Sequence, residues 1–318
     1  MVAGSKFALC QIRCYGCAMS SPPKRSSARL PYLLLTLAVL FWAGNFILGR
    51  AVRMDVPPIG LAFWRWAVAS LLVLVPALAP LKRDWNTIRR NGPILMVLAG
   101  TGVAAFNTLA YSGLQYTVAI NAFLMQTLMP VFIVVFSFLL FRVRINRRQV
   151  AGVATCLAGA VIIIVRGNWQ VVASLALNPG DLLVLLAVLC YAAYSVLLRQ
   201  RPPIHPLSFV AVTFVAGTAM LLPFYLWETV RIRSLALNRV TILAILYVAI
   251  FPSIISYLCY NRGVEALGAN RAGLFLYLMP VFGSLMAVGL LGEAFLWYHW
   301  VGIALIATGL VASMRAMK

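Results

Sequence analysis

Acidic side chains and histidines are scarce in this chain of 318 residues. Only six Asp and Glu and two His occur, and charged residues of all kinds make up 10%. An enzyme that acts on lipid inside a membrane would need His, Asp or Glu clustered near the interface, and these residues are too few and too dispersed for that. Cys10, Cys14 and Cys17 stand close together, but no His or fourth Cys lies nearby to complete a zinc site. We therefore expect no catalytic residue, no metal and no cofactor.

Nucleotide-binding motifs are also missing. The sequence contains no P-loop, no dinucleotide-binding fingerprint and no zinc-protease helix. Because a primary pump needs a nucleotide site, ATP-driven transport by this chain alone is not expected.

Long apolar runs dominate what is present. Hydrophobic residues make up 63% of the chain, far more than a soluble domain can bury in one core. A bilayer core needs about 20 apolar residues per helix, and ten segments approach or reach that length: residues 31–48, 59–81, 93–113, 119–141, 150–165, 182–198, 207–227, 242–260, 272–291 and 297–314. The connections are short, so the sequence predicts an all-α integral membrane protein with ten transmembrane helices. Residues 1–29 form a tail before the first helix, and Met19, which opens a more ordinary polar lead-in, is a candidate for the true start.

The basic residues predict the orientation. The formal net charge of +20 would suggest nucleic acid in a soluble protein, but here Lys and Arg gather in the short connections. On one side of the predicted helices 17 of them lie near the helix ends, against six on the other, which are Arg50, Arg53, Arg166, Arg231, Arg233 and Arg239. Since cytoplasmic loops carry the excess of Lys and Arg, both termini are predicted to be cytoplasmic, with no nucleic-acid partner.

The chain repeats itself at an offset of about 150 residues. The string LMPVF at 128–132 recurs at 278–282, and Gly113, Gly152 and Gly159 match glycines in the same frame. One residue out of register, 38–40 matches 187–189. Each half holds five predicted helices, an odd number, so the second half should enter the membrane upside down relative to the first. Inverted repeats of this kind suit alternating access about a central site.

Several stretches are similar to a known family. They are FWAGNF at 41–46, FWRW at 63–66, the Ala-x-x-Ala followed by Pro-Val-Phe in helices four and nine, GDLL at 180–183, and GE at 292–293. With the two five-helix halves, they resemble the EamA-like branch of the drug/metabolite transporter superfamily over residues 30–315. The resemblance implies two EamA-like repeats, at 30–167 and 180–315, and an exporter of amino acids or related metabolites in a bacterial inner membrane. One departure is Phe141-Arg142, where the family usually has Gly-Glu.

Alternatives to this function are open. A broad-specificity drug efflux protein of the same fold is the nearest, and a membrane-embedded lipid enzyme or a channel is less favoured.

The acidic residues all lie at or near predicted helix ends: Asp55, Asp84, Asp181, Glu228, Glu265 and Glu293. Proton-coupled carriers usually bury a carboxylate near the midplane, so facilitated export or exchange is favoured.

The candidate substrate-cavity residues are polar or aromatic groups inside the spans. They are Trp42, Asn45, Arg65, Asn107, Tyr111, Gln126, Tyr191, Tyr194, Tyr257, Tyr260 and Tyr277. Arg65 is the one charge well inside a span; it could attract a substrate carboxylate or serve as a structural strut on backbone carbonyls. Pro130 and Pro280 fall within helices four and nine, where each could act as a hinge or as a static kink.

Two glycine pairs line one face each of helices five and ten. Gly152 and Gly159 are seven residues apart, as are Gly302 and Gly309, so each pair is nearly two turns apart. Small faces let helices approach closely, either within the chain or in a homodimer. The expected partners are therefore a small-molecule substrate, the lipid bilayer and, as an option, a second copy of the chain.

Overall fold

Helices make up nearly all of the computed structural model, and no strand occurs in the part of the chain that it describes. The structure describes residues 29–52, 56–117, 119–168, 170, 178–236, 238–291 and 294–315. The predictions for the N-terminal tail, Met19, Asp55 and Glu293 concern positions outside these described residues. The helical content follows from composition, because a chain that contacts lipid must satisfy its backbone hydrogen bonds within each segment.

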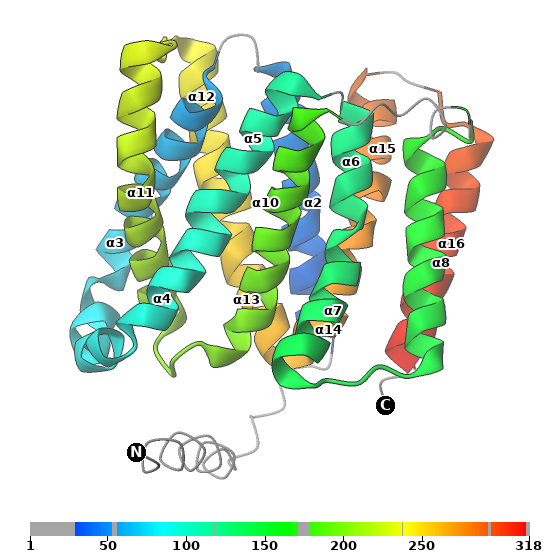
Figure 1. Ribbon diagram of the computed structural model, residues 1–318, viewed down its shortest axis with the longest axis horizontal. Helices are drawn as coiled ribbons and strands as arrows, with labels where there is room; N and C mark the ends of the chain where they lie inside the picture. Colours follow the sequence, from blue (N-terminus) through cyan, green and yellow to red (C-terminus); the bar gives the residue numbers. More distant parts are fainter. Residues whose placement is uncertain are drawn as a thin grey trace, which may run out of the picture. The chain divides into compact units, whose positions relative to one another are not determined.

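The elements follow one another as helices with short connections (Figure 1). The first half contains α2 (Leu30–Ala51), α3 (Pro58–Arg90), α4 (Gly92–Ala99), η1 (Gly100–Ala105), α5 (Phe106–Tyr116), α6 (Ala119–Thr127), α7 (Met129–Phe141) and α8 (Arg147–Ile164). The second half contains α10 (Pro179–Leu197), η2 (Leu198–Gln200), α11 (Pro206–Arg231), α12 (Arg239–Val248), η3 (Ala249–Ile255), α13 (Ser256–Leu267), α14 (Ala269–Leu274), η4 (Phe275–Tyr277), α15 (Leu278–Leu291) and α16 (Trp297–Arg315).

Nine helices in the described part are long and apolar enough to cross a membrane. The region of the predicted ninth span, 272–291, is instead divided among α14, η4 and α15, and α15 alone has 14 residues. Two spans are longer than the apolar runs suggested, because α3 continues to Arg90 and the eighth span runs over Arg239–Leu267. In both cases the helix, with its backbone hydrogen bonds, extends through polar residues beyond the end of the apolar stretch.

The outer faces of the helices are apolar. On α3, Leu71, Val75 and Leu78 are exposed by 66%, 73% and 56%, and their spacing places them on one side of the helix. The opposite side of α3 is buried, including Ala69 and Val73. Exposed apolar surface of this extent is stable in lipid and not in water, so the chain is an integral membrane protein.

Irregular helix geometry recurs at the repeat offset. A π-helical segment, η1, interrupts the third span, and another, η3, interrupts the eighth span about 150 residues later. The fourth span breaks at Leu128, between α6 and α7, and α14 passes through the 3₁₀ segment η4 into α15 at Leu278. The two halves therefore share departures from ideal helix as well as sequence.

The positions of Pro130 and Pro280 differ from the sequence expectation of a bend inside a continuous helix. Pro130 is the second residue of α7 and Pro280 the third residue of α15. Proline is tolerated in the first turn of a helix, where its missing N–H has no intrahelical role. Each proline thus begins a new helix after an interruption.

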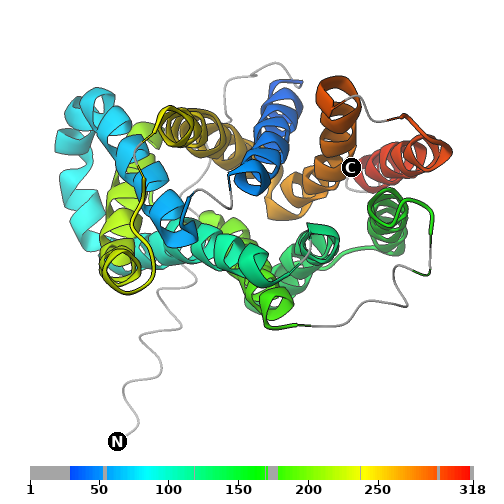
Figure 2. The same ribbon diagram turned by 90° about the horizontal axis from the view of Figure 1, so that it is seen from above.

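Helices α8 and α16 pack side by side in both views (Figure 1 and Figure 2). A Cβ atom added to Gly159 would lie 2.7 Å from the carbonyl oxygen of Gly302, and one on Gly152 would lie 2.8 Å from that of Gly309. The order of these contacts shows that the two helices run antiparallel. The glycine faces therefore hold α8 and α16 against each other within one chain.

Helices α3 and α11 form a second antiparallel pair. The backbone N–H groups of Ile59 and Gly60 at the start of α3 donate to Glu228 near the end of α11. At the other end of α3, Asp84 accepts from the backbone N–H of His205, just before α11. Each of these pairs joins a helix of the first half to one of the second.

We predict that Gly159→Ala destabilises the protein, because the added methyl would meet backbone rather than a movable side chain. The expected loss is about 1–3 kcal/mol, measured as a lower midpoint of thermal unfolding in detergent. Gly283→Ala in α15 is the matched control, since a Cβ there meets nothing within 4 Å and Ala favours a helix. Equal unfolding midpoints for the two variants would contradict the close contact of α8 with α16.

Candidate functional site

A small cavity lies among helices of both halves. Its lining comes from Trp42, Asn45, Arg65, Phe106, Asn107, Gln126, Met129, Tyr191, Tyr257, Leu276 and Met279. Its volume is about 20 Å³, which is room for about one water molecule. An organic solute does not fit this conformation, so any solute that binds here must first separate the surrounding helices.

Seven of the predicted cavity residues lie on this lining: Trp42, Asn45, Arg65, Asn107, Gln126, Tyr191 and Tyr257. Sequence reasoning missed Phe106, Met129, Leu276 and Met279. Two of these could have been found from the repeat, since Met129 and Met279 stand at the same place in the repeated string LMPVF. They were missed because apolar residues inside a span carry no polar signal.

Residues at matching places in the two halves face this cavity together. Gln126 and Leu276, Met129 and Met279, and Asn107 and Tyr257 are each 150 positions apart, and Trp42 and Tyr191 are 149 apart. These are the two offsets at which the sequence repeats. The cavity is therefore built from equivalent parts of the two halves.

Arg65 on α3 crosslinks four spans beside the cavity. Its Nε donates to Ser253 Oγ at 2.6 Å, and one terminal nitrogen donates to Asn45 Oδ1 and Asn107 Oδ1 at 3.1 and 3.0 Å. That nitrogen also donates to Tyr111 OH, and the other terminal nitrogen donates to the Pro252 carbonyl. Arg65 is only 1% exposed, so its charge is held by neutral oxygens inside the membrane-spanning bundle.

The irregular helices supply part of this network. Pro252 and Ser253 belong to the π-helical segment η3, and Asn107 is the second residue after η1. The carbonyl of Pro252 accepts from Trp42 Nε1 at 2.9 Å as well as from Arg65. A π-helical turn withdraws backbone carbonyls from the regular ladder, which leaves them able to accept from side chains.

A tyrosine–asparagine hydrogen bond occurs once in each half. Tyr111 OH donates to Asn45 Oδ1 at 2.9 Å, and Tyr194 OH donates to Asn261 Oδ1 at 2.8 Å. Asn45 corresponds to Tyr194 and Tyr111 to Asn261 at the repeat offsets, so the tyrosine and the asparagine have exchanged places. No charged residue stands 148 to 150 positions after Arg65, and the cavity is therefore charged on one side only.

Four predicted cavity residues lie off the lining. Tyr111 and Tyr194 form the bonds just described, and Tyr260 OH contacts Ser195 Oγ at 3.0 Å. Tyr277 packs in a separate apolar cluster with Cys156 of α8 and Ile306 of α16. Tyr260 still supports the cavity wall, because its ring lies 5.1 Å from that of Trp42.

The two prolines change the backbone hydrogen bonding of residues that line the cavity. Proline has no N–H, so the carbonyls four residues earlier, at Gln126 and Leu276, receive no helical hydrogen bond from Pro130 or Pro280. Both residues line the cavity. The repeated prolines therefore alter the backbone hydrogen bonding of two equivalent residues on the lining.

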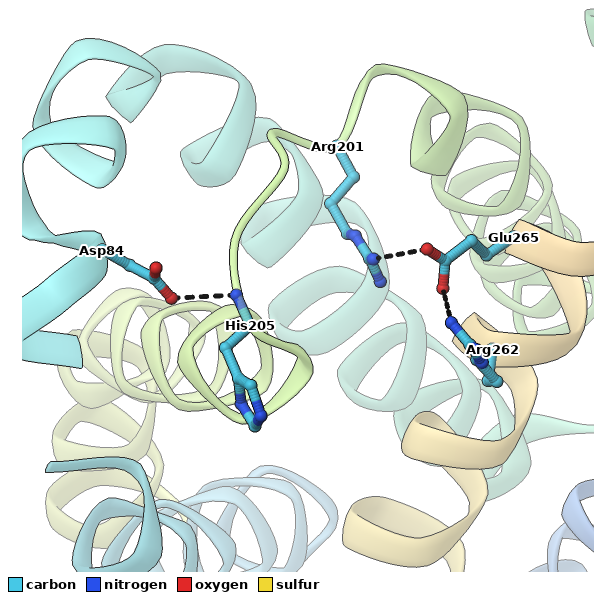
Figure 3. Close-up of polar contacts among 5 residues, drawn as sticks. All are labelled: Asp84, Arg201, His205, Arg262 and Glu265. Carbon is cyan, nitrogen blue, oxygen red and sulfur yellow. Dashed lines mark hydrogen bonds and ion pairs between the residues drawn. The ribbon is translucent and has the colours of Figure 1, made fainter. Parts of the chain in front are cut away.

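The described acidic residues lie at helix ends, as expected. Glu228 accepts from two backbone N–H groups at the start of α3, and Asp181 belongs to a capping box with Asn178 at the start of α10. Asp84 and Glu265 lie at the other end of the bundle, where Arg201 and Arg262 converge on Glu265 (Figure 3). Their nitrogen–oxygen distances to Glu265 are 3.3 and 2.9 Å. Both ion pairs of the described residues therefore lie away from the cavity.

Comparison with known proteins points to one family of transporters. The model of the EamA-like transporter family matches residues 29–165 and 178–315. The uncharacterized transporter YyaM of Bacillus subtilis is 26% identical over 291 residues, which cover 90% of this chain and 94% of the relative. An uncharacterized transporter of Archaeoglobus fulgidus is 29% identical over 269 residues, which cover 82% of this chain and 89% of the relative.

A third relative has a more specific name. The "Probable terminal-alkyne amino-acid exporter" of Streptantibioticus cattleyicolor is 27% identical over 260 residues, covering 81% of this chain and 84% of the relative. A solved crystal structure matches the fold with a TM-score of 0.75 at 22% identity, covering 93% of this chain and all of the other. At that identity the structure supports the fold alone.

We predict that Arg65→Lys destabilises the protein strongly. A single ammonium nitrogen cannot reach the five oxygens that the guanidinium contacts, so several of them lose their buried partner. The expected loss of stability is about 3 kcal/mol, measured as the midpoint of thermal unfolding in detergent. Arg148→Lys, at an exposed position on α8, is the control and should change little. An Arg65→Lys variant as stable as this control would show that the network does not hold the spans together.

Proposed function

Because this chain belongs to the EamA-like transporter family, we propose that it is a secondary transporter that exports small organic metabolites, above all amino acids or related compounds, by alternating access. The proposal includes ten transmembrane helices arranged as two inverted repeats, with α14, η4 and α15 together forming the ninth span. The repeats correspond to residues 30–167 and 180–315. Membership of a transporter family and the apolar outer face of the bundle support this assignment.

The contacts between the halves support the inverted arrangement. Helix pairs α3 with α11 and α8 with α16 join positions that correspond in the two halves, and both pairs run antiparallel. Corresponding helices that run in opposite directions are what an inverted repeat requires. Helix α2 of the first half also contacts the eighth span, which is not its counterpart, and runs antiparallel to it, with Trp42 bonded to Pro252 and Ala38 to Ser256.

The observation that carries the proposal is the composition of the cavity. Equivalent residues from the two halves line it together, with offsets of 149 or 150 positions. If the halves exchange conformations, a site built from equivalent parts is exposed first to one side of the membrane and then to the other. Its closed form, with room for about one water molecule, fits a conformation between the two open states.

The membrane and the direction of transport are further parts of the proposal. The excess of basic residues on one side supports cytoplasmic termini, and the ion pairs of Glu265 then lie at the cytoplasmic end. The bacterial relatives support a location in the plasma membrane, which is the inner membrane where a bacterium has two. A homodimer also stays a proposal. The glycine faces that suggested it contact each other within the chain, so a dimer would need another surface.

Counterflow in proteoliposomes tests this function. Purified protein is reconstituted with one unlabelled metabolite inside, and uptake of the same labelled metabolite is followed over a panel of amino acids, organic acids and cationic drugs. We expect saturable exchange of one or more amino acids. Exchange confined to cationic drugs would favour the drug efflux alternative, and non-saturating flux would favour a channel. Absence of exchange for the whole panel, with protein shown to be folded, would contradict the proposal.

The prolines provide a separate prediction about the transport cycle. Pro130→Ala restores an N–H that can donate to the Gln126 carbonyl, so α6 and α7 can join into one helix across Leu128. Pro280→Ala likewise restores an N–H that can donate to the Leu276 carbonyl, so η4 and α15 can join into one helix. We expect initial flux per folded protein to fall about tenfold in either variant, with little change in thermal stability, since neither removes a large packing group. The double variant should be no slower than the slower single one, because one stalled half already stops the cycle.

Pro76→Ala is the matched control for these variants. Pro76 lies inside the continuous helix α3 and is exposed, so its replacement should leave flux unchanged. Wild-type flux in both Pro130→Ala and Pro280→Ala would refute the hinge and leave the two prolines as features of packing.

A further inference from the structure

Three polar groups that line the cavity have no hydrogen-bond partner among the described residues. They are Asn107 Nδ2, Gln126 Nε2 and Tyr191 OH. The three side chains are only 2%, 7% and 2% exposed, so bulk water does not satisfy them. The orientation of the Asn107 amide is fixed, because its Oδ1 accepts from Arg65 and its NH₂ group must therefore point elsewhere. Buried donors without a partner are costly, and here three of them converge on one cavity.

The charge beside these groups has one sign. Arg65 lines the same cavity and all of its partners are neutral oxygens. The buried carboxylates of the described residues are committed elsewhere, Asp181 to Thr117 and the backbone of Asn178, and Glu228 to the start of α3. In a medium of low dielectric such an uncompensated charge attracts an anion and repels a cation.

The rest of the lining is apolar and large. Phe106 and Tyr257 contribute rings, Met129 and Met279 contribute thioethers at equivalent places, and Leu276 completes the surface. Such a wall suits an aromatic or branched aliphatic group, and methionine side chains can adjust as the cavity widens. The lining therefore combines one positive charge and three donors with a large apolar surface.

We propose that this cavity recognises its substrate by a carboxylate, which accepts hydrogen bonds from Asn107, Gln126 and Tyr191 within the field of Arg65 while the substrate's apolar side group contacts the methionines and rings. The inference rests on the proposed function and specifies its substrate class: monocarboxylates with an apolar or aromatic body, among them neutral amino acids. Cationic amines that lack the carboxylate are rejected. Arg65 is a positioning and electrostatic residue here, since its own donors are engaged by the protein.

The test compares matched acids and amides as competitors. Phenylalanine with phenylalaninamide, leucine with leucinamide, and 3-phenylpropionate with 3-phenylpropanamide are each added to counterflow of any solute that the wild-type protein exchanges. Binding to the purified protein is measured in parallel by thermal shift in detergent. We expect each acid to compete about tenfold or more better than its amide, because a site with buried donors rejects ligands that leave them unpaired. Equal competition by acids and amides, or failure of all acids to compete, would overturn the inference while leaving the transport proposal standing.

Conservative variants test whether the preference for acids over amides arises at this cavity. Tyr191→Phe removes only a hydroxyl that has no partner, so the fold should be kept while competition by acids weakens about fivefold, the loss of one hydrogen bond. Tyr260→Phe is the control, because that buried hydroxyl bonds to Ser195 away from the lining. Equal effects of the two variants on acid competition would contradict the assignment.

A carboxylate added beside Arg65 gives a readout that a structural role would not produce. Asn107→Asp keeps an oxygen for Arg65 but replaces the NH₂ donor with a second oxygen and neutralises the local charge. The ratio of acid to amide competition should fall about tenfold or invert. If Asn107→Asp does not fold, Gln126→Glu supplies the same change from another span. An unchanged ratio in a folded variant would overturn the inference. If nothing in the panel is exchanged by the wild-type protein, the proposed function itself fails, which is a distinct result.

Discussion

The burial of one positive charge in a bundle with little else to neutralise it shapes the centre of this protein. Arg65 is almost fully buried and makes five hydrogen bonds to neutral oxygens from other spans. Regular helices offer few such oxygens, because their carbonyls are used in their own ladder. Four of the five oxygens belong to η3 and to α5, the helix that follows η1, among them the Pro252 carbonyl, and the fifth belongs to Asn45 of α2. Departures from regular helix and the buried charge thus depend on each other, and the cavity lies where they meet.

The repeat explains why the same region of each half is irregular. Both halves carry a π-helical segment, η1 in the first and η3 in the second, and an interruption at the LMPVF string. These features place helix interruptions next to residues that line one cavity. The halves differ in the chemistry of their lining, since Arg65 has no charged counterpart in the second half and Gln126 is matched there by Leu276. A symmetric mechanism can therefore operate on an asymmetric binding site.

Much of this could be read from the sequence, and the reasons are physical. Long apolar runs separated by basic connections specify membrane helices, and the identity of 128–132 with 278–282 exposed the repeat. Seven of the eleven polar and aromatic residues chosen from inside the spans lie on the lining of one cavity, in keeping with the exclusion of polar groups from lipid. The π-helical segments carry no composition signal and could not be foreseen. The break at Leu128 was hidden for a similar reason, since proline inside an apolar run reads equally as a bend or as the start of a second helix. Tyr277 was misplaced because a buried tyrosine in a span faces protein whether or not that protein lines a cavity.

The central claim is that the two inverted halves exchange conformations about this cavity, and paired distance measurements test it most directly. Spin labels at Lys82 and Ala266 report on one end of the bundle, and labels at Arg231 and Tyr116 report on the other. All four positions are exposed, and they correspond in pairs at offsets of 149 and 150. Each pair is introduced into a Cys-depleted protein and measured by pulsed electron spin resonance with and without a transported solute. The account predicts that the solute shifts the two distance distributions in opposite directions, one end widening as the other narrows. Distances that shift in the same direction, or a shift at one end alone, would contradict it.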